Sequence, residues 1–340
     1  MPDVPVADLI VEGNELVIAT HGRGFWALDN VAPLRQATPA VLANNVYLFG
    51  SPVGVRSGPG IPITWISKTE TIHARLEILD SAGILLRTFE PDTAKADSAD
   101  TPETQRRRGA GPYLPKGTGL QHVTWDLRTQ GITTFPGMVF WGAGTNGPAV
   151  PPGRYTARLA IDGRTVTTPL VVTRNPRTPD VSNADLRAQY AFSRRVRDKA
   201  EEANQAVIAI RRVKAQLADR LKKSNDAALK TASDSLLAHA SAVEESIYQV
   251  KNQSNQDPLN FPIKVNNRLA TLLSMAENGD GRPTNNMPEI FGIMSTELKG
   301  YTDRLSVVWK TDLVAVNREL ARLKLIGVDP NCDKVAERCG

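Results

Sequence analysis

The stretch LVIATHGRGFWALD, residues 16–29, places two apolar runs on either side of a glycine turn. Residues 16–20 and 25–29 are short and rich in β-branched and aromatic side chains, as strands are, and HGRG supplies the turn between them. A similar run at 6–11 precedes them, separated by a second glycine turn. The sequence therefore predicts a three-stranded antiparallel meander within residues 1–50.

A meander of this size has two open edges and two faces, and it is marginally stable alone. Its apolar side chains need a neighbouring layer that buries them. We therefore expect residues 1–50 to form these strands and a linker, and to depend on a partner for stability.

Residues 51–177 predict an immunoglobulin-like β-sandwich. Their apolar and polar residues alternate over short runs bounded by turn signals such as Asp162-Gly163, and the runs lie at 72–80, 84–89, 122–127, 154–161 and 165–172. Residues 91–119 lack an apolar period and predict a mobile insertion. The sandwich range contains no cysteine pair to bridge two sheets.

Residues 178–327 predict an antiparallel helical bundle. Ser182 and Asp185 resemble a capping box at a helix start, and apolar residues then recur at steps of three and four. A polar turn at 224–226 and a glycine-rich break at 278–281 divide the pattern into successive helices joined by short loops, as in bundles. Residues 328–340 form a tail.

Composition and charge exclude several classes. Of the 340 residues, 41% are hydrophobic and 23% are charged, so the chain can bury real cores. The net charge of +5 is spread along the chain and does not indicate a nucleic-acid partner. The sequence contains no run of about 18 apolar residues, so it predicts no membrane-spanning helix. Its first residues do not resemble a signal peptide.

The sequence shows no motif for catalysis, a metal or a cofactor. Its four histidines are isolated from one another, and the GAGTNG stretch at 142–147 is followed by a proline rather than by a helix. We therefore predict no catalytic, metal-binding or cofactor-binding residue. Cys332 and Cys339 could form a small disulfide loop or remain two thiols on a tail.

Two zones of the chain resemble known families, and the helical region resembles the part that follows them. The stretch THGRGFW at 20–26 resembles the closing blade of sortilin-type, BNR-repeat β-propellers, which occur in large secreted bacterial proteins often labelled glycosyl hydrolase. The segments at 119–128 and 151–159 are similar to the FlgD-like immunoglobulin domain that follows such propellers. The helical region is similar to their C-terminal bundle by position and pattern.

The resemblance implies that residues 1–50 are a residual last blade whose companions lie elsewhere. It implies an extracytoplasmic location and a non-catalytic accessory region that binds protein or glycan. Two alternatives stay open: part of a glycosidase-like hydrolase whose catalytic residues lie in a missing N-terminal propeller, and a structural or adhesion protein. His21, Arg23, Trp26 and Trp141 are the candidate binding residues. For His21 and Trp26 the residues favour a structural role, a hydrogen bond or packing between strands or blades, over binding.

Overall fold

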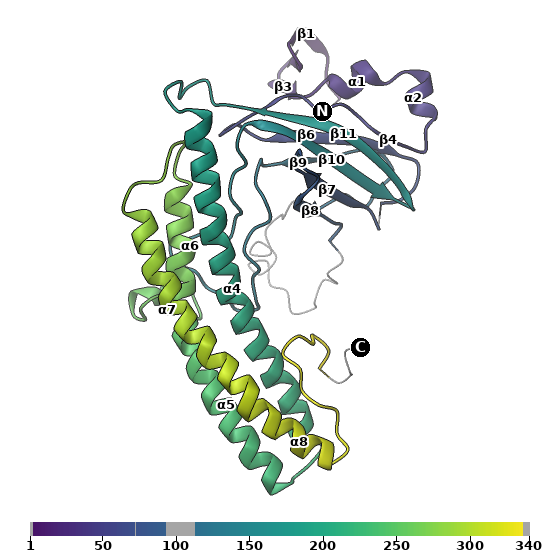
Figure 1. The fold of residues 1–340 in the computed structure, drawn as a ribbon. Helices are drawn as coiled ribbons and strands as arrows, with labels where there is room; N and C mark the ends of the chain where they lie inside the picture. The colour runs from purple at the N-terminus through teal and green to yellow at the C-terminus, as the bar shows by residue number, and fades with distance from the viewer. Residues whose placement is uncertain (1–2, 72, 93–112, 336–340) are drawn as a thin grey trace. The chain divides into compact units, whose positions relative to one another are not determined.

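The computed structural model describes residues 3–71, 73–92 and 113–335 (Figure 1). The chain divides into two compact units, the first combining Met1–Gln130 with Ala149–Arg187 and the second combining Gly131–Pro148 with Ala188–Gly340. The first unit holds three β-sheets, and the second holds most of the helical residues. The coarse expectation of a multidomain chain with separate β and α parts is confirmed.

The predicted meander is present as a separate sheet. Strands β1 (Val6–Glu12), β2 (Glu15–Thr20) and β3 (Phe25–Leu28) pair antiparallel in chain order. A two-residue turn joins β1 to β2, and its Gly13 has a φ of +56°, which glycine adopts without the steric cost of a Cβ. We call residues 6–28 the meander.

Helix α1 (Ala32–Gln36) ties the meander to the next sheet. The Val31 amide donates to the Asn14 carbonyl oxygen at 2.8 Å, and the Arg35 guanidinium donates to the Gly13 carbonyl oxygen at 2.9 Å. Gln36 exchanges two hydrogen bonds with the backbone of Gly50. A second short helix, α2 (Pro39–Ala43), follows.

The rest of the first unit consists of two sheets. One has the order β5-β11-β10-β7-β8, and the other has the order β4-β6-β9. The bounds are β4 Val46–Leu48, β5 Gly54–Val55, β6 Ile61–Ser67, β7 Arg75–Leu79, β8 Leu85–Phe89, β9 Gly119–Trp125, β10 Gly153–Ile161 and β11 Arg164–Thr173. Most of these strands match the predicted runs, whereas β4, β5 and β6 were not predicted.

The inner faces of these two sheets meet in a buried core. Trp125 of β9 packs edge-on against Tyr155 of β10, with their ring centroids 5.4 Å apart. Alternate side chains along β10 are buried, as the two-residue period of a strand requires, and Ile61, Ile63 and Trp65 of β6 are fully buried. Two β layers with interdigitating side chains follow from this pattern. The middle of the predicted insertion at 91–119 lies outside the described residues.

The second unit is built on long helices. These are α4 (Asn183–Leu221), α5 (Ala227–Ile247), α6 (Val265–Ala276), α7 (Met287–Val308) and α8 (Val314–Arg322), with a 3₁₀ turn at Asp257–Leu259 and a π turn at Trp309–Leu313. The predicted capping box is confirmed, because Ser182 and Asp185 exchange hydrogen bonds at the start of α4. No helix in the described part of the chain is both long and apolar enough to cross a membrane.

Residues 131–148, which we call the strap, belong to the helical unit although they fall within the range assigned to the sandwich. Ile132 and Phe135 enter the helical core, and the Phe135 ring packs edge-on against Tyr248 at 5.0 Å. These two apolar side chains explain the position of the strap, because burying each of them stabilises the helical unit by about 1.5–3 kcal/mol.

Candidate functional site

His21, Arg23 and Trp26 lie on the exposed turn and third strand of the meander. The His21 amide donates to the Pro5 carbonyl oxygen at 3.1 Å, and the Trp26 indole donates to the Arg23 carbonyl oxygen at 3.2 Å. Among the residues that the structure describes, the His21 imidazole and the Arg23 guanidinium make no hydrogen bond or ion pair. Their side chains are thus available for contact with something outside this unit.

The pairing register sorts the meander's side chains onto two faces. Leu9, Ile18 and Trp26 pair across the three strands, so they share one face, and the row at Val11, Leu16 and Leu28 lies on the same side. We call these six residues the apolar face.

Four of the six side chains on the apolar face are exposed, among them Leu9 at 59% and Trp26 at 41%, whereas Leu16 and Ile18 of the central strand are half-buried. The opposite side carries Ile10 at 61% and Phe25 at 81%. Exposed apolar side chains therefore lie on both faces of the meander.

Trp141, the fourth predicted site residue, lies on the strap in the other unit. The buried Asn267 side chain accepts a hydrogen bond from the Trp141 amide at 2.7 Å and donates one to its carbonyl oxygen at 3.1 Å. The backbone of Trp141 is therefore fixed, while its side chain stays half-buried. The structure does not bring Trp141 together with His21, Arg23 and Trp26 in one unit.

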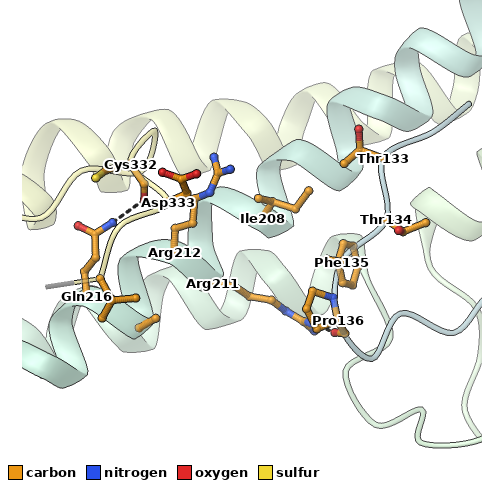
Figure 2. A pocket seen from close by; sticks show the side chains of 12 residues that line it. Thr133, Thr134, Phe135, Pro136, Ile208, Arg211, Arg212, Gln216, Cys332 and Asp333 are labelled. Carbon is orange, nitrogen blue, oxygen red and sulfur yellow. Dashed lines mark hydrogen bonds between the residues drawn. The ribbon is translucent and has the colours of Figure 1, made fainter. Parts of the chain in front are cut away.

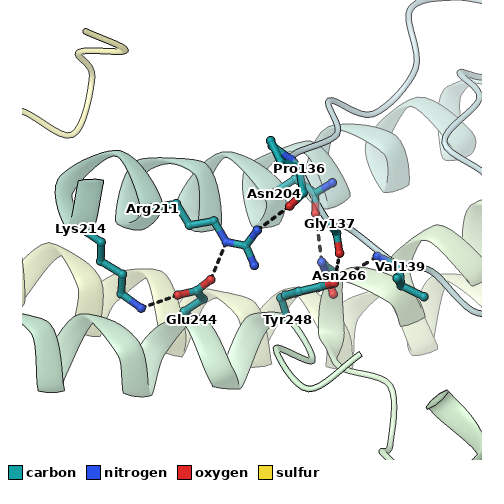
Figure 3. A network of polar contacts seen from close by, with 9 residues as sticks. All are labelled: Pro136, Gly137, Val139, Asn204, Arg211, Lys214, Glu244, Tyr248 and Asn266. Atoms are coloured by element: carbon teal, nitrogen blue, oxygen red, sulfur yellow. Dashed lines mark hydrogen bonds and ion pairs between the residues drawn. The ribbon is translucent and has the colours of Figure 1, made fainter. Parts of the chain in front are cut away.

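A polar network holds the strap on helices α4 and α5 (Figure 3). Glu244 is buried and accepts from Arg211 at 2.7 Å and from Lys214 at 2.6 Å, so two cations compensate its charge. The Arg211 guanidinium also donates to the Pro136 carbonyl oxygen at 2.9 Å and stacks over Phe135. One arginine thus neutralises a buried acid and anchors the strap.

Tyr248 anchors the strap a second time. Its hydroxyl donates to the Gly137 carbonyl oxygen at 3.0 Å and accepts from the Val139 amide at 3.1 Å. Burial raises the pKa of Tyr248, so the phenol stays protonated and keeps its donor. Deeper in the same network, Asn266 donates to Asn204, which donates in turn to the Thr133 carbonyl oxygen.

A pocket of about 360 Å³ lies on α4 between the strap and residues 323–335, which follow α8 and which we call the C-terminal segment (Figure 2). Its walls are Thr133, Thr134, Phe135 and Pro136 from the strap, Ile208, Arg211, Arg212, Ala215 and Gln216 from α4, and Cys332, Asp333 and Val335 from the C-terminal segment. The α4 residues recur at helical spacing and share one side of that helix. We call this cavity the α4 pocket.

Two α4 side chains hold the C-terminal wall of the pocket. Gln216 donates to the carbonyl oxygens of Asp329 and Cys332, at 2.9 and 2.8 Å. Arg220, which is almost fully buried, donates to the carbonyl oxygens of Ile326 and Val335 at 2.9 and 2.7 Å. Cys332 is disulfide-bonded. Cys339, its predicted partner, lies outside the described residues.

A second groove of about 310 Å³ lies in the first unit. It is lined by the end of the meander, by α1 and by one side of β6 and β9, with His122 and Asp29 among its residues. Neither cavity was predicted from the sequence, because each is lined by residues from separate segments that share no motif.

The described residues contain no group of three or more His, Cys, Asp or Glu side chains able to hold a metal ion. One Ser–Asp–His cluster occurs in the helical unit, where Asp312 accepts from Ser235 at 2.8 Å and lies 3.2 Å from His239 Nδ1. A nucleophile relay places the histidine between the serine and the acid, whereas here the aspartate is in the middle. This cluster therefore joins two helical segments rather than activating Ser235.

Comparison with known proteins leaves the family open. No family model matches the chain, and no curated protein matches it. One solved structure, titled "Biofilm associated protein - BSP domain", matches 52% of this chain at 10% identity with a TM-score of 0.19. The match spans only 20% of that chain, and a similarity this low carries no argument about fold or function.

Proposed function

We propose that this chain is a non-catalytic interaction region whose meander packs its apolar face against a β-sheet of a β-propeller. The observation that carries the proposal is the exposure of four of the six side chains on the apolar face, with Leu9 and Trp26 both more than 40% exposed. Removing such side chains from water stabilises an assembly by about 25 cal/mol per Å² of apolar surface. The resemblance of THGRGFW to a closing propeller blade supports the same partner.

A protein sheet suits this face better than a glycan does. All six of its side chains are apolar, in two rows of Leu9, Ile18, Trp26 and Val11, Leu16, Leu28. A glycan site needs polar groups that orient the sugar hydroxyls, besides an aromatic platform. An apolar, pleated face is instead complementary to a second sheet, and sheets stack about 10 Å apart in this way.

The remaining parts extend the proposal. The two β layers packed through Trp125 and Tyr155 are compatible with an FlgD-like immunoglobulin domain, and the helical unit would serve as a spacer or dimerisation element. The disulfide at Cys332 supports an extracytoplasmic location, because disulfides persist in oxidising compartments.

The experiment uses the reading frame upstream of Met1 in the source gene. We expect it to encode β-strand repeats, and those repeats are produced as a separate polypeptide. Calorimetry then measures their binding to this chain, to Leu9→Asp and to the control Ile84→Asp. Ile84 is an equally exposed apolar residue, at 56%, outside the meander.

We expect Leu9→Asp to weaken binding by about tenfold or more, since a charge would be buried without a partner, and Ile84→Asp to leave it unchanged. An upstream frame without strand repeats, or equal binding by the two variants, would contradict the proposal. Hydrolysis of a chromogenic glycoside by the purified chain would refute its non-catalytic part.

A further inference from the structure

The α4 pocket carries Arg212 and Asp333 toward one end, and Phe135 and Pro136 together with the Arg211 guanidinium toward the other (Figure 2). Figure 2 shows Arg212 and Asp333 at the end near Gln216, and Phe135 and Pro136 at the opposite end, with Ile208 between them. A volume of about 360 Å³ lies within the range of small-molecule sites, roughly 300–1,000 Å³. Apolar walls with a few polar groups that fix orientation are typical of such sites.

Only two of the pocket's charges are available to a ligand. Arg211 is committed to Glu244 and to the Pro136 carbonyl oxygen. Within the part of the chain that the structure describes, Arg212 and Asp333 make no hydrogen bond or ion pair, either with each other or with another residue. The pocket thus offers one cation and one anion at the same end.

The walls are held in place without a ligand. Gln216 and Arg220 hold the C-terminal segment, and Asn204, Arg211 and Tyr248 hold the strap. A ligand would therefore cause little ordering of the chain, and a preformed site loses less entropy on binding.

We propose that the α4 pocket binds a free α-amino acid with an apolar side chain. Its carboxylate pairs with the Arg212 guanidinium, its ammonium pairs with the Asp333 carboxylate, and its side chain lies against Ile208 and Phe135. A ligand with a carboxylate alone meets the repulsion of Asp333, and one with an ammonium alone meets the repulsion of Arg212. A zwitterion satisfies both charges together. This site is independent of the meander.

The experiment measures binding of three probes to the full chain by calorimetry. The probes are L-phenylalanine, 3-phenylpropionate, which lacks the ammonium, and 2-phenylethylamine, which lacks the carboxylate. Amide chemical shifts at 133–135, 208–216 and 332–335 report whether binding occurs in the α4 pocket. We expect phenylalanine to bind at least about tenfold more tightly than either analogue, because each analogue lacks one charge-assisted hydrogen bond.

Variants separate the two charges. We expect Arg212→Gln and Asp333→Asn each to weaken phenylalanine binding about tenfold or more. Lys230→Gln and Asp234→Asn, which make the same charge changes at exposed positions of α5, are the controls and should bind as the unaltered chain does. Both pocket residues lack structural partners within the described chain, so their variants should fold, which circular dichroism checks.

Three results would overturn the proposal. The first is an absence of phenylalanine binding at millimolar concentration. The second is equal binding by an analogue that carries a single charge. The third is unchanged binding in both Arg212→Gln and Asp333→Asn.

Discussion

The β1–β2 and β10–β11 hairpins have the same local design and opposite environments. Each is antiparallel, and each turns through two residues that include a glycine with positive φ, Gly13 in one and Gly163 in the other. Every residue of β1 is exposed, whereas β10 buries alternate residues between two sheets. Antiparallel pairing is therefore compatible with either environment, and burial is what distinguishes the two hairpins.

Two tryptophans should show the largest difference between these environments. Trp125 is fully buried and donates to the Arg128 carbonyl oxygen, while Trp26 is exposed and donates in the same way to Arg23. We expect Trp125→Ala to lower the free energy of unfolding by about 3–5 kcal/mol and Trp26→Ala by less than about 1 kcal/mol. Urea denaturation followed by circular dichroism measures both values. Similar losses for the two variants would show that the meander is buried in solution.

The two turn glycines provide a smaller and sharper test. A Cβ added at Gly13 or Gly163 meets no atom within 4 Å, so alanine introduces only backbone strain, about 1–2 kcal/mol in the left-handed region. We expect Gly163→Ala to lower the global stability of the β layers. Gly13→Ala should instead speed amide exchange within the meander and leave the global transition unchanged. Hydrogen exchange measured by mass spectrometry distinguishes the two effects. A loss of global stability in Gly13→Ala would contradict the expected difference between the two hairpins.

One hydroxyl hydrogen bond in the buried core and one in the exposed meander should differ by a smaller free energy. Tyr155 donates to the Pro151 carbonyl oxygen at 2.6 Å in the core, and Thr20 donates to the Gly24 carbonyl oxygen at 2.7 Å on the meander surface. We expect Tyr155→Phe to cost about 1 kcal/mol, because the carbonyl loses a buried partner. Thr20→Val should cost close to nothing, since water replaces the hydroxyl. Thermal unfolding measures both variants, and equal shifts in melting temperature would contradict this expectation.

A pH effect in the helical unit is the smallest predicted change. Asp226 caps α5 and accepts hydrogen bonds from the Arg322 side chain and from the Leu229 amide. These two bonds lower the pKa of Asp226. A carboxyl whose pKa is lowered on folding stabilises the fold above its unfolded pKa, near 3.9, and loses that contribution as pH falls below it. We expect the melting temperature, followed by helical ellipticity, to fall when the pH is lowered from 5 to 3. The fall should be smaller in Asp226→Asn. Asp234→Asn, an exposed control, should keep the full change.

Much of the β structure was predictable because its signals are local. Alternation and turn residues located the meander strands and both strands of the β10–β11 hairpin. Strand β6 was missed, since Pro62 interrupts its pattern and its partners β4 and β9 are distant in sequence. Burial of the β6 side chains depends on those distant partners, which no local window contains.

The α4 pocket could not be predicted from the sequence either, because it also depends on residues that are distant along the chain. The strap is rich in glycine and proline, as a loop within a sandwich is. Its attachment depends on Asn204 and Tyr248, which lie 71 and 109 residues after the strap residues that they bind. The sequence analysis considered Cys332 for a disulfide only. The pocket exists because three separate segments meet, and none of them carries a motif.

The chain passes between its two units at three places, after Gln130, Pro148 and Arg187. A single cut therefore cannot yield two intact halves. A piece beginning near residue 178 would lack Ile132 and Phe135, and it would expose the helical core that they occupy. Recombination that exchanges contiguous gene segments could not transfer the helical unit as a cassette, so the two units are expected to have been inherited together.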